Sequence, residues 1–255
     1  MKKRRAYNLG ILMIALAILF SSCEKETAAD DAVVISATGN ISAKVDEFRQ
    51  LLGATLNTTP GAVGGRREIN WDGVPENMLG QPLPNDFFNP TDAGAPTSRQ
   101  RGLVYAGGSG DFRVSKTNFS EVNQKAVTEF AAFSGDKSFA NVSSNLWDIY
   151  PKVPGKDENA TVKGFGIVFS DVDTQNGTYL EFFNENASLG KFYVPQHTTA
   201  SSFSFLGVYF KSQKVTRIRV VHQGKLADNE QDITNGGAKD LITLDDFLYD
   251  EPVKK

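Results

Sequence analysis

The sequence predicts an all-β protein, an antiparallel β-sandwich with one short N-terminal helix. Residues 162–210 contain three or four short runs rich in Phe, Val, Tyr and Ile, separated by turn clusters such as Gln175-Asn176-Gly177, as between consecutive antiparallel strands. Val215–His222 alternates apolar and polar residues, which is typical of a half-buried strand. Leu241–Tyr249 is a further apolar run, which we expect to close the domain.

The elements before residue 162 are shorter. A helix is predicted from Ser42, which can cap it, to Gly53, because apolar residues recur there at helical spacing and form one face. Residues 57–101 are rich in Gly, Pro, Asn and Asp, so we expect long loops, held to the core by aromatic residues. Strands are expected near residues 102–105 and 111–114, and residues 115–160 alternate polar loops with apolar anchors.

The first residues predict an export signal. Lys2–Arg5 is cationic, and the apolar run Leu9–Phe20 is shorter than the roughly 20 residues that a membrane-spanning helix needs. The signal ends in Ser21-Ser22-Cys23, which resembles the lipobox of bacterial lipoproteins and implies that Cys23 is acylated as the first residue of the mature chain. An ordinary cleaved signal with a chance cysteine is the alternative. We therefore expect residues 1–22 to be a lipoprotein signal peptide, 23–40 a tether and 41–255 a single β-sandwich domain.

Charge and cysteine content exclude several classes of binding partner and site. The chain has 27 basic and 30 acidic residues, and loss of residues 1–22 removes four basic ones, which leaves 23 against 30 and a net charge of −7. Nucleic acid and anionic membrane surfaces are poor partners for such a protein. Cys23 is the single cysteine, so none remains for a disulfide or a zinc site. We expect a lipid anchor in the outer membrane of a Gram-negative bacterium, with a periplasmic or surface-exposed domain.

Three strings carry a resemblance that covers nearly the whole mature chain. They are GRREINWDGVP at Gly65–Pro75, FSDVD at Phe169–Asp173 and LDDF at Leu244–Phe247. The chain resembles a family of secreted bacterial proteins, mostly uncharacterised, some of which carry a PEP-CTERM-type sorting tail. The resemblance implies a jelly-roll form of the β-sandwich and no established activity.

Catalytic patterns are sparse. His197 lies in a predicted loop, and His222 ends a strand on its apolar side, where a core or edge histidine is the simpler interpretation. The sequence contains no HExxH or GxSxG string and no glycine-rich phosphate loop. Asp171 and Asp173 could share one face of a strand at a separation of roughly 6.5 to 7 Å, which glycosidase carboxylate pairs also show. A glycoside-active enzyme of the cell envelope is therefore an alternative function.

Acidic residues at strand ends suit a calcium ion better, since calcium takes six to eight oxygen ligands. Candidate metal ligands are Asp72, Asp171, Asp173, Asp245 and Asp246. Neighbouring residues of a strand point to opposite faces, so we expect one of Asp245 and Asp246 to be buried and satisfied. Either calcium, with Asp72 or Asp171 nearby, or an arginine could satisfy it; the arginines considered are Arg66, Arg67, Arg217 and Arg219.

Aromatic residues in or near the predicted loops could stack on sugar rings. Candidates are Trp71, Trp147, Tyr105 and Tyr150, although a tryptophan among apolar neighbours is more often buried. Arg66 could hold a carboxylate ligand or pair with Glu68 and Asp72. The sequence thus favours a lipid-anchored, non-catalytic binding or adhesion module, with a glycan or a cell-envelope protein as its partner and calcium as a structural ion. A structural module that contacts only a protein is the third alternative.

Overall fold

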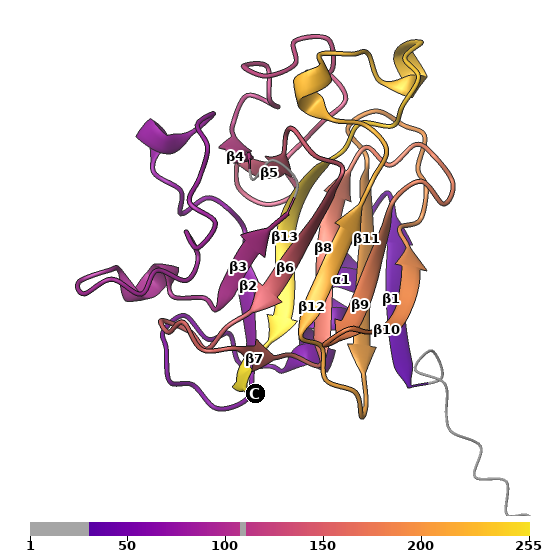
Figure 1. Cartoon of the computed structure of the whole chain (residues 1–255). Helices are drawn as coiled ribbons and strands as arrows, with labels where there is room; N and C mark the ends of the chain where they lie inside the picture. Colours follow the sequence, from indigo (N-terminus) through magenta and orange to yellow (C-terminus); the bar gives the residue numbers. More distant parts are fainter. Residues whose placement is uncertain (1–30, 108–110) are drawn as a thin grey trace, which may run out of the picture.

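Two antiparallel β-sheets lie face to face in the computed structural model, which describes residues 31–107 and 111–255 (Figure 1). Every pairing between the strands named below is antiparallel. The larger sheet has the spatial order β1 (Ala32–Thr38), β11 (Phe203–Phe210), β8 (Gly164–Ser170), β13 (Thr243–Asp250), β5 (Ser138–Asn141) and β4 (Phe112–Ser115), and β2 (Arg66–Ile69) also pairs with β13.

The smaller sheet faces β8 and β13. Its order is β10 (Ala187–Tyr193), β9 (Tyr179–Asn184), β12 (Arg217–Val221), β6 (Leu146–Pro151) and β3 (Leu103–Ala106). A two-stranded ladder joins β14 (Val253–Lys254) to β7 (Ala160–Thr161). Four single-turn 3₁₀ helices lie in the loops: η1 (Glu76–Met78), η2 (Thr97–Arg99), η3 (Leu226–Asp228) and η4 (Ile233–Asn235). The structure confirms the predicted all-β antiparallel sandwich with one short N-terminal helix, whereas its jelly-roll form stays a prediction.

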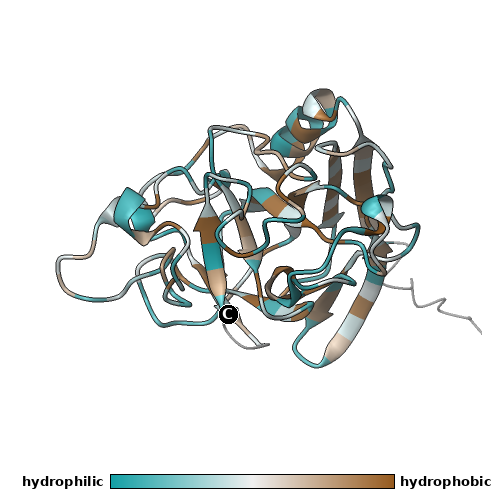
Figure 2. Cartoon of the chain, turned by 90° about the horizontal axis from the view of Figure 1, so that it is seen from above, coloured by the Kyte–Doolittle hydropathy of each residue, from teal (hydrophilic) through white to brown (hydrophobic). Residues whose placement is uncertain are grey.

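Aromatic and branched side chains from both sheets fill the interior. Trp71 stacks on Phe139 with ring centroids 3.8 Å apart, and Phe247 meets the edge of the same indole at 5.0 Å. Trp147 of β6 packs into this group from the other sheet. Seen from the loop-bearing end, the strands are mainly hydrophobic, and many of the loops are hydrophilic (Figure 2).

The helix α1 (Ser42–Leu52) covers the outer face of the larger sheet (Figure 1). Phe48 packs over two glycines of the sheet, and a Cβ atom at Gly166 or Gly207 would lie 2.7 Å from its ring. Glycine at both positions therefore lets the helix approach the sheet. The predicted cap at Ser42 is wrong by one residue, because Ile41 is the N-cap and caps with no side-chain hydrogen bond.

The predicted tether ends earlier than residue 40. β1 pairs with β11 along its whole length, from Ala32 opposite Phe210 to Thr38 opposite Ser204. The carboxylate of Asp31 accepts hydrogen bonds from the backbone N–H groups of Ser212 and Gln213. Residues 31–40 therefore belong to the domain. Without β1, the strand β11 would present an open edge of the sheet.

The predicted signal peptide and Cys23 lie outside the described residues. Among the residues that are described, no helix combines the length and the apolar composition needed to cross a membrane.

The pairing of β8 with β13 positions the acidic residues. Ser170 at the end of β8 lies opposite Thr243 at the start of β13, so the chain after β8 and the chain before β13 meet at one end of the sandwich. The register then shifts between Leu244 and Phe247, where β13 contains one extra residue. A bulge of this kind breaks the alternation of side chains between the two faces.

Candidate metal centre

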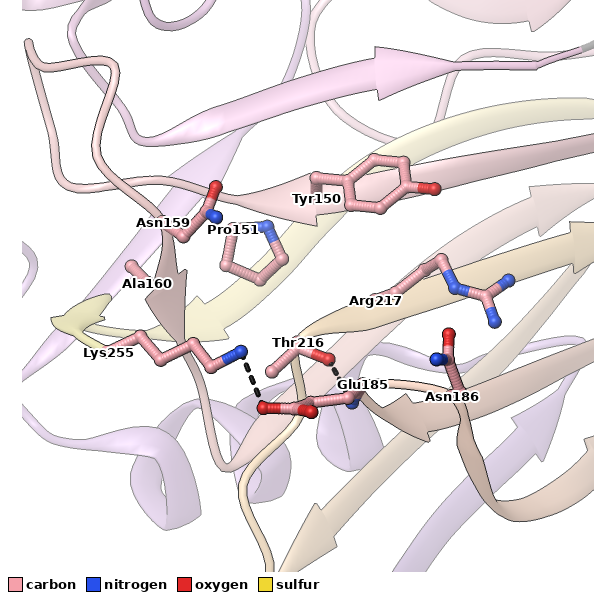
Figure 3. A pocket seen from close by; sticks show the side chains of 9 residues that line it. All are labelled: Tyr150, Pro151, Asn159, Ala160, Glu185, Asn186, Thr216, Arg217 and Lys255. Atoms are coloured by element: carbon pink, nitrogen blue, oxygen red, sulfur yellow. Dashed lines mark hydrogen bonds and ion pairs between the residues drawn. The ribbon is translucent and has the colours of Figure 1, made fainter.

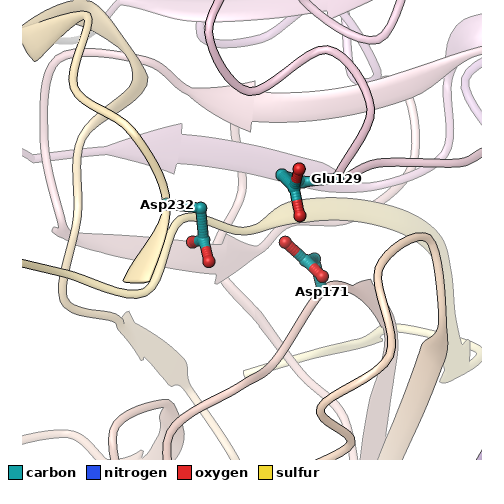
Figure 4. Close-up of side chains that lie close together, drawn as sticks. All are labelled: Glu129, Asp171 and Asp232. Carbon is teal, nitrogen blue, oxygen red and sulfur yellow. The ribbon is translucent and has the colours of Figure 1, made fainter. Parts of the chain in front are cut away.

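Five carboxylates gather at the end of the sandwich where β8 stops and β13 begins. Asp171 and Asp173 lie one and three residues after the end of β8, and Asp240 lies three residues before the start of β13. Glu129 comes from the β4–β5 connection and Asp232 from the β12–β13 connection. Figure 4 shows the carboxylates of Glu129, Asp171 and Asp232 turned toward one another.

The five side chains form two overlapping groups. One oxygen from each of Glu129, Asp171 and Asp232 lies within 4.8 Å of the other two, and the same holds for Asp173, Asp232 and Asp240. Asp232 belongs to both groups. Their exposed fractions range from 0% for Asp171, Asp232 and Asp240 to 6% for Asp173, so the cluster is closed to solvent.

Local backbone structure holds the first two aspartates in place. Asp171 has a left-handed conformation with φ 69°, and its N–H donates to the carbonyl of Ser202 at 3.1 Å. A non-glycine residue in this region costs on the order of 1 kcal/mol or more, so its surroundings must enforce it. Such strained residues concentrate at ligand sites.

The carboxylates of Asp171 and Asp173 are buried without partners. No donor within residues 31–107 and 111–255 hydrogen-bonds to either oxygen of Asp171 or to either oxygen of Asp173. An unmet buried carboxylate is costly, because removing a charge from water is offset only by a partner. A cation bound by these two residues would satisfy all four oxygens.

The other three carboxylates are partly satisfied, which fixes their orientation. Asp232 caps η4 by accepting from the N–H of Thr234 at 2.9 Å, and its second oxygen accepts from the N–H of Leu241 at 2.7 Å. Asp240 accepts from the N–H groups of Asp173 and Thr174 through one oxygen, whereas its Oδ1 has no donor among the described residues.

Glu129 is held by side chains of the β12–β13 connection. Its carboxylate accepts from Asn235 and, at 3.4 Å, from the hydroxyl of Thr234. Its own carbonyl accepts from the N–H of Ser201 at 2.8 Å. These bonds aim the carboxylate at Asp171 and Asp232.

Mutual repulsion disfavours the simultaneous ionisation of all five carboxylates. Two unit charges about 4.8 Å apart repel by roughly 3 kcal/mol at an effective dielectric constant of about 20. Burial, followed by repulsion from Asp173, raises the pKa of Asp171 to about 9. Burial likewise raises the pKa of Asp240 to about 6, and burial together with repulsion from Asp232 raises that of Asp173.

No arginine or lysine relieves this repulsion. The salt bridges formed within the described ranges leave out all five carboxylates. A donor set made only of oxygen suits a hard cation. Calcium fits a closed site with many carboxylates better than magnesium, which requires strict octahedral geometry and keeps several waters.

The remaining predicted metal ligands form a separate cluster at the β13 bulge. Asp245 and Asp246 are both buried, although we expected burial of one, because the bulge interrupts the alternation. Asp245 accepts from the N–H groups of Phe133 and Ser134, and Asp246 accepts from Nη2 of Arg49 at 3.2 Å. Arg49, which was not among the arginines considered, therefore supplies the countercharge.

Asp72 lies near this second cluster and outside the first. Its carboxylate accepts from Asn70 at 3.0 Å and from the N–H of Asp136 at 3.2 Å. Burial, followed by repulsion from Asp246 and to a smaller extent from Asp72, raises the pKa of Asp245 to about 8. None of Asp72, Asp245 and Asp246 belongs to a group of acids spaced to hold a metal in the part of the chain that the structure describes. The ion pair with Arg49 accounts for Asp246. Asp245 is held by backbone N–H groups at one oxygen, and its Oδ1 atom has no donor among the described residues.

The predicted tryptophan platforms are wrong. Trp71 and Trp147 are both 0% exposed and lie in the aromatic core, as does Tyr105, so none presents a ring face to a sugar. Burial of these large apolar rings stabilises the fold more than their exposure at the surface would.

Arg66 is engaged within the fold. It donates from Nε to Glu68 at 2.6 Å, as the sequence indicated, and from Nη1 to the carbonyl of Gly53 at 3.0 Å. Asp72, the other expected partner, bonds elsewhere. Arg66 therefore secures the connection between α1 and β2 instead of holding a ligand.

Tyr150 is the one predicted platform that lines a surface pocket. The pocket, drawn in Figure 3, has a volume of about 270 Å³. It lies at the opposite end of the sandwich from the carboxylates, because its residue Ala160 comes just before β8 and the carboxylates follow the end of β8. Lys255 and Glu185 pair across it at 2.7 Å, and Arg217 stacks over the ring of Phe183 at 3.6 Å. Its remaining lining is Pro151, Asn159, Ala160, Asn186 and Thr216.

His222 is a core histidine, as the simpler interpretation held. It is buried, and burial lowers its pKa to about 4, so the imidazole is neutral near pH 7. His197 donates its backbone N–H to the carbonyl of Val172, next to the carboxylates, but belongs to neither group of candidate ligands.

Sequence reasoning found two of the five carboxylates. Asp171 and Asp173 stand out because they end a long apolar strand. Asp240 could have been found from the pairing of β8 with β13, which places it beside them. Glu129 and Asp232 lie in irregular loops, where no local pattern distinguishes a ligand from a solvated acid.

Comparison with known proteins identified no matching family model, and no characterised protein or solved structure is significantly similar to the chain. The resemblance to a secreted bacterial family stays a prediction.

The raised pKa values predict how the metal-free protein responds to pH. An aspartate in an unfolded chain has a pKa of about 3.9, whereas that of Asp171 is about 9 in the fold. The folded state therefore binds more protons between these values, and the free energy of unfolding should fall as the pH rises from 6 to 9. Urea unfolding at several pH values, in the presence of a chelator, measures this free energy. Asp171→Asn should flatten the dependence, and an unfolding free energy that rises over this range would contradict the cluster as described.

Proposed function

We propose that this protein is a calcium-binding, non-catalytic binding module of the cell envelope. One observation carries the calcium component: Asp171 and Asp173 bury four carboxylate oxygens that have no donor among the described residues, within a cluster of five acids. Calcium would bind these oxygens in their ionised form and remove the repulsion that raises their pKa values.

The ion would have a structural role in this proposal. The five acids come from three connections that lie far apart in the sequence, so one cation would cross-link the loops at this end of the sandwich. The glycosidase alternative needs a sugar to reach Asp171 and Asp173. Their exposed fractions of 0% and 6% favour a buried ion over an acid–base pair.

Calcium should stabilise the folded protein. At about 100 times its dissociation constant a ligand adds about 2.7 kcal/mol, and each kcal/mol raises Tm by about 2 to 4 °C for a domain of this size. We expect Tm to be about 5 to 10 °C higher in calcium than in chelator, measured by differential scanning calorimetry.

A variant at the centre separates this effect from general ion binding. Asp171→Asn should reduce the calcium-dependent shift and raise Tm in chelator, because it removes one repelling charge. Asp92→Asn, at an exposed loop position, makes the same charge change and should leave the shift intact. An equal calcium shift in wild type and Asp171→Asn would place the ion elsewhere.

Attachment to the envelope is proposed through an acyl group on Cys23, which the lipobox resemblance supports. β1 begins at the end of the sandwich opposite the carboxylates. The eight residue-to-residue steps from Cys23 to Asp31 span at most about 28 Å when fully extended. An anchor there would keep the pocket end near the membrane and point the carboxylate end away from it.

The anchor is tested by cell fractionation. Cys23→Ala should move the protein from the membrane fraction to the soluble fraction, because no acyl chain can then be attached. Ser22→Thr keeps the cysteine and serves as the control. Retention of Cys23→Ala in the membrane fraction, at the wild-type level, would exclude the anchor.

A glycan is the ligand class that we propose for the pocket around Tyr150. Its lining combines an aromatic ring with amide, hydroxyl and charged groups, a combination that suits stacking and hydrogen bonding to a sugar. The ring of Tyr150 is half-buried, so part of it faces the pocket.

Retention on a panel of immobilised polysaccharides tests the glycan proposal. At least one polysaccharide should retain the protein, and Tyr150→Ala should weaken retention about fivefold, since stacking of one ring contributes on the order of 1 kcal/mol. Tyr193→Ala, at an exposed tyrosine outside the pocket, is the control. Hydrolysis of the panel would favour the enzyme alternative. If the polysaccharides are neither bound nor hydrolysed, a protein partner would be favoured.

A further inference from the structure

We propose that the carboxylate cluster binds two calcium ions, with Asp232 as their shared ligand. This inference rests on the proposed calcium site and specifies how many ions the site holds and what the second one does.

The arrangement of ligands divides into two half-sites. Glu129 and Asp171 form one group with Asp232, and Asp173 and Asp240 form a second group with the same residue. Each group has one oxygen per residue within 4.8 Å of the other two, a spacing that allows three oxygens to bind one ion. Asp232 has two carboxylate oxygens and can offer one to each ion.

Each half-site has its own unpartnered buried carboxylate. In the first half-site both oxygens of Asp171 lack a donor among the described residues, and Asp171 is fully buried. In the second half-site both oxygens of Asp173 and the Oδ1 atom of Asp240 lack one, and these residues are 6% and 0% exposed. An ion in the first half-site alone would leave the second set of oxygens unmatched.

The charge of the cluster also favours two ions. Five ionised carboxylates carry a formal charge of −5, so one divalent cation leaves −3 in a buried site and two leave −1. A buried charge of −3 is costly unless positive charges lie in contact with it. The described residues form no salt bridge to the cluster that would supply it.

The second ion would fasten the connection between β12 and β13. Residues 222–242 carry both Asp232 and Asp240, and Asp240 already accepts from the N–H groups of Asp173 and Thr174. An ion bound by Asp173, Asp232 and Asp240 would therefore join this connection to the end of β8. The first ion would join the β4–β5 connection to the same place through Glu129.

Native mass spectrometry of the full-length protein in calcium counts the ions directly. Wild type should retain two. Glu129→Gln and Asp240→Asn should each retain one, because each removes a ligand from a single half-site, and Asp232→Asn should retain none. Asp92→Asn should retain two.

The outcomes separate this inference from the proposed function. One ion in wild type would overturn the two-ion site while leaving the calcium site in place, whereas no ion would overturn both. If Asp240→Asn and Glu129→Gln do not fold, the wild-type count still decides. Proteolysis supplies a second readout: Asp240→Asn should expose residues 222–242 to cleavage in calcium, and protection equal to wild type would contradict the role given to the second ion.

Discussion

The antiparallel pairing of β8 with β13 in the middle of the larger sheet is the constraint on which the rest of the structure depends. It buries Phe165, Ile167 and Phe247 against the smaller sheet, and it buries Val168 and Leu248 under α1. The same pairing brings the residues after β8 beside those before β13. The core and the carboxylate cluster are therefore two consequences of one register.

Three buried acids of this protein are paired with an arginine. Glu251 forms a two-bond pair with the fully buried Arg67, Asp148 pairs with Arg219, and Asp246 pairs with Arg49. In each of these cases an arginine supplies the positive charge and the hydrogen-bond donors that a carboxylate needs away from water. The cluster around Asp232 has no arginine or lysine partner among the salt bridges of the described residues. Both oxygens of Asp171 and of Asp173 also lack a hydrogen-bond donor there, although the cluster is the most concentrated group of buried acids in the described ranges. This contrast within one molecule is the strongest reason to regard the cluster as a ligand site instead of an ordinary part of the core.

The two ends of the sandwich differ in what they can contribute to binding. The carboxylate end is closed, and the ion proposed there would act on the stability and order of three loops. The opposite end holds the pocket around Tyr150 and is formed by the β9–β10 hairpin, the start of β12 and the C-terminal residue. Binding of a ligand at the pocket and binding of an ion at the cluster can therefore be measured and altered independently, since residues separated by the length of a strand act additively.

The sequence by itself determined the class of fold, because alternation of apolar residues and turn clusters are local properties that strands impose wherever they lie. It also determined that Asp171 and Asp173 end a buried strand. Tertiary structure alone decided the rest of the site: Glu129, Asp232 and Asp240 lie 42, 61 and 69 residues from Asp171 in the chain, and pairing of distant strands brings them together. It decided as well that Trp71 and Trp147 face inward and that both aspartates of the β13 bulge are buried. The physical reason is that side-chain burial and the approach of charges depend on which segments pack together, and local sequence does not specify that packing.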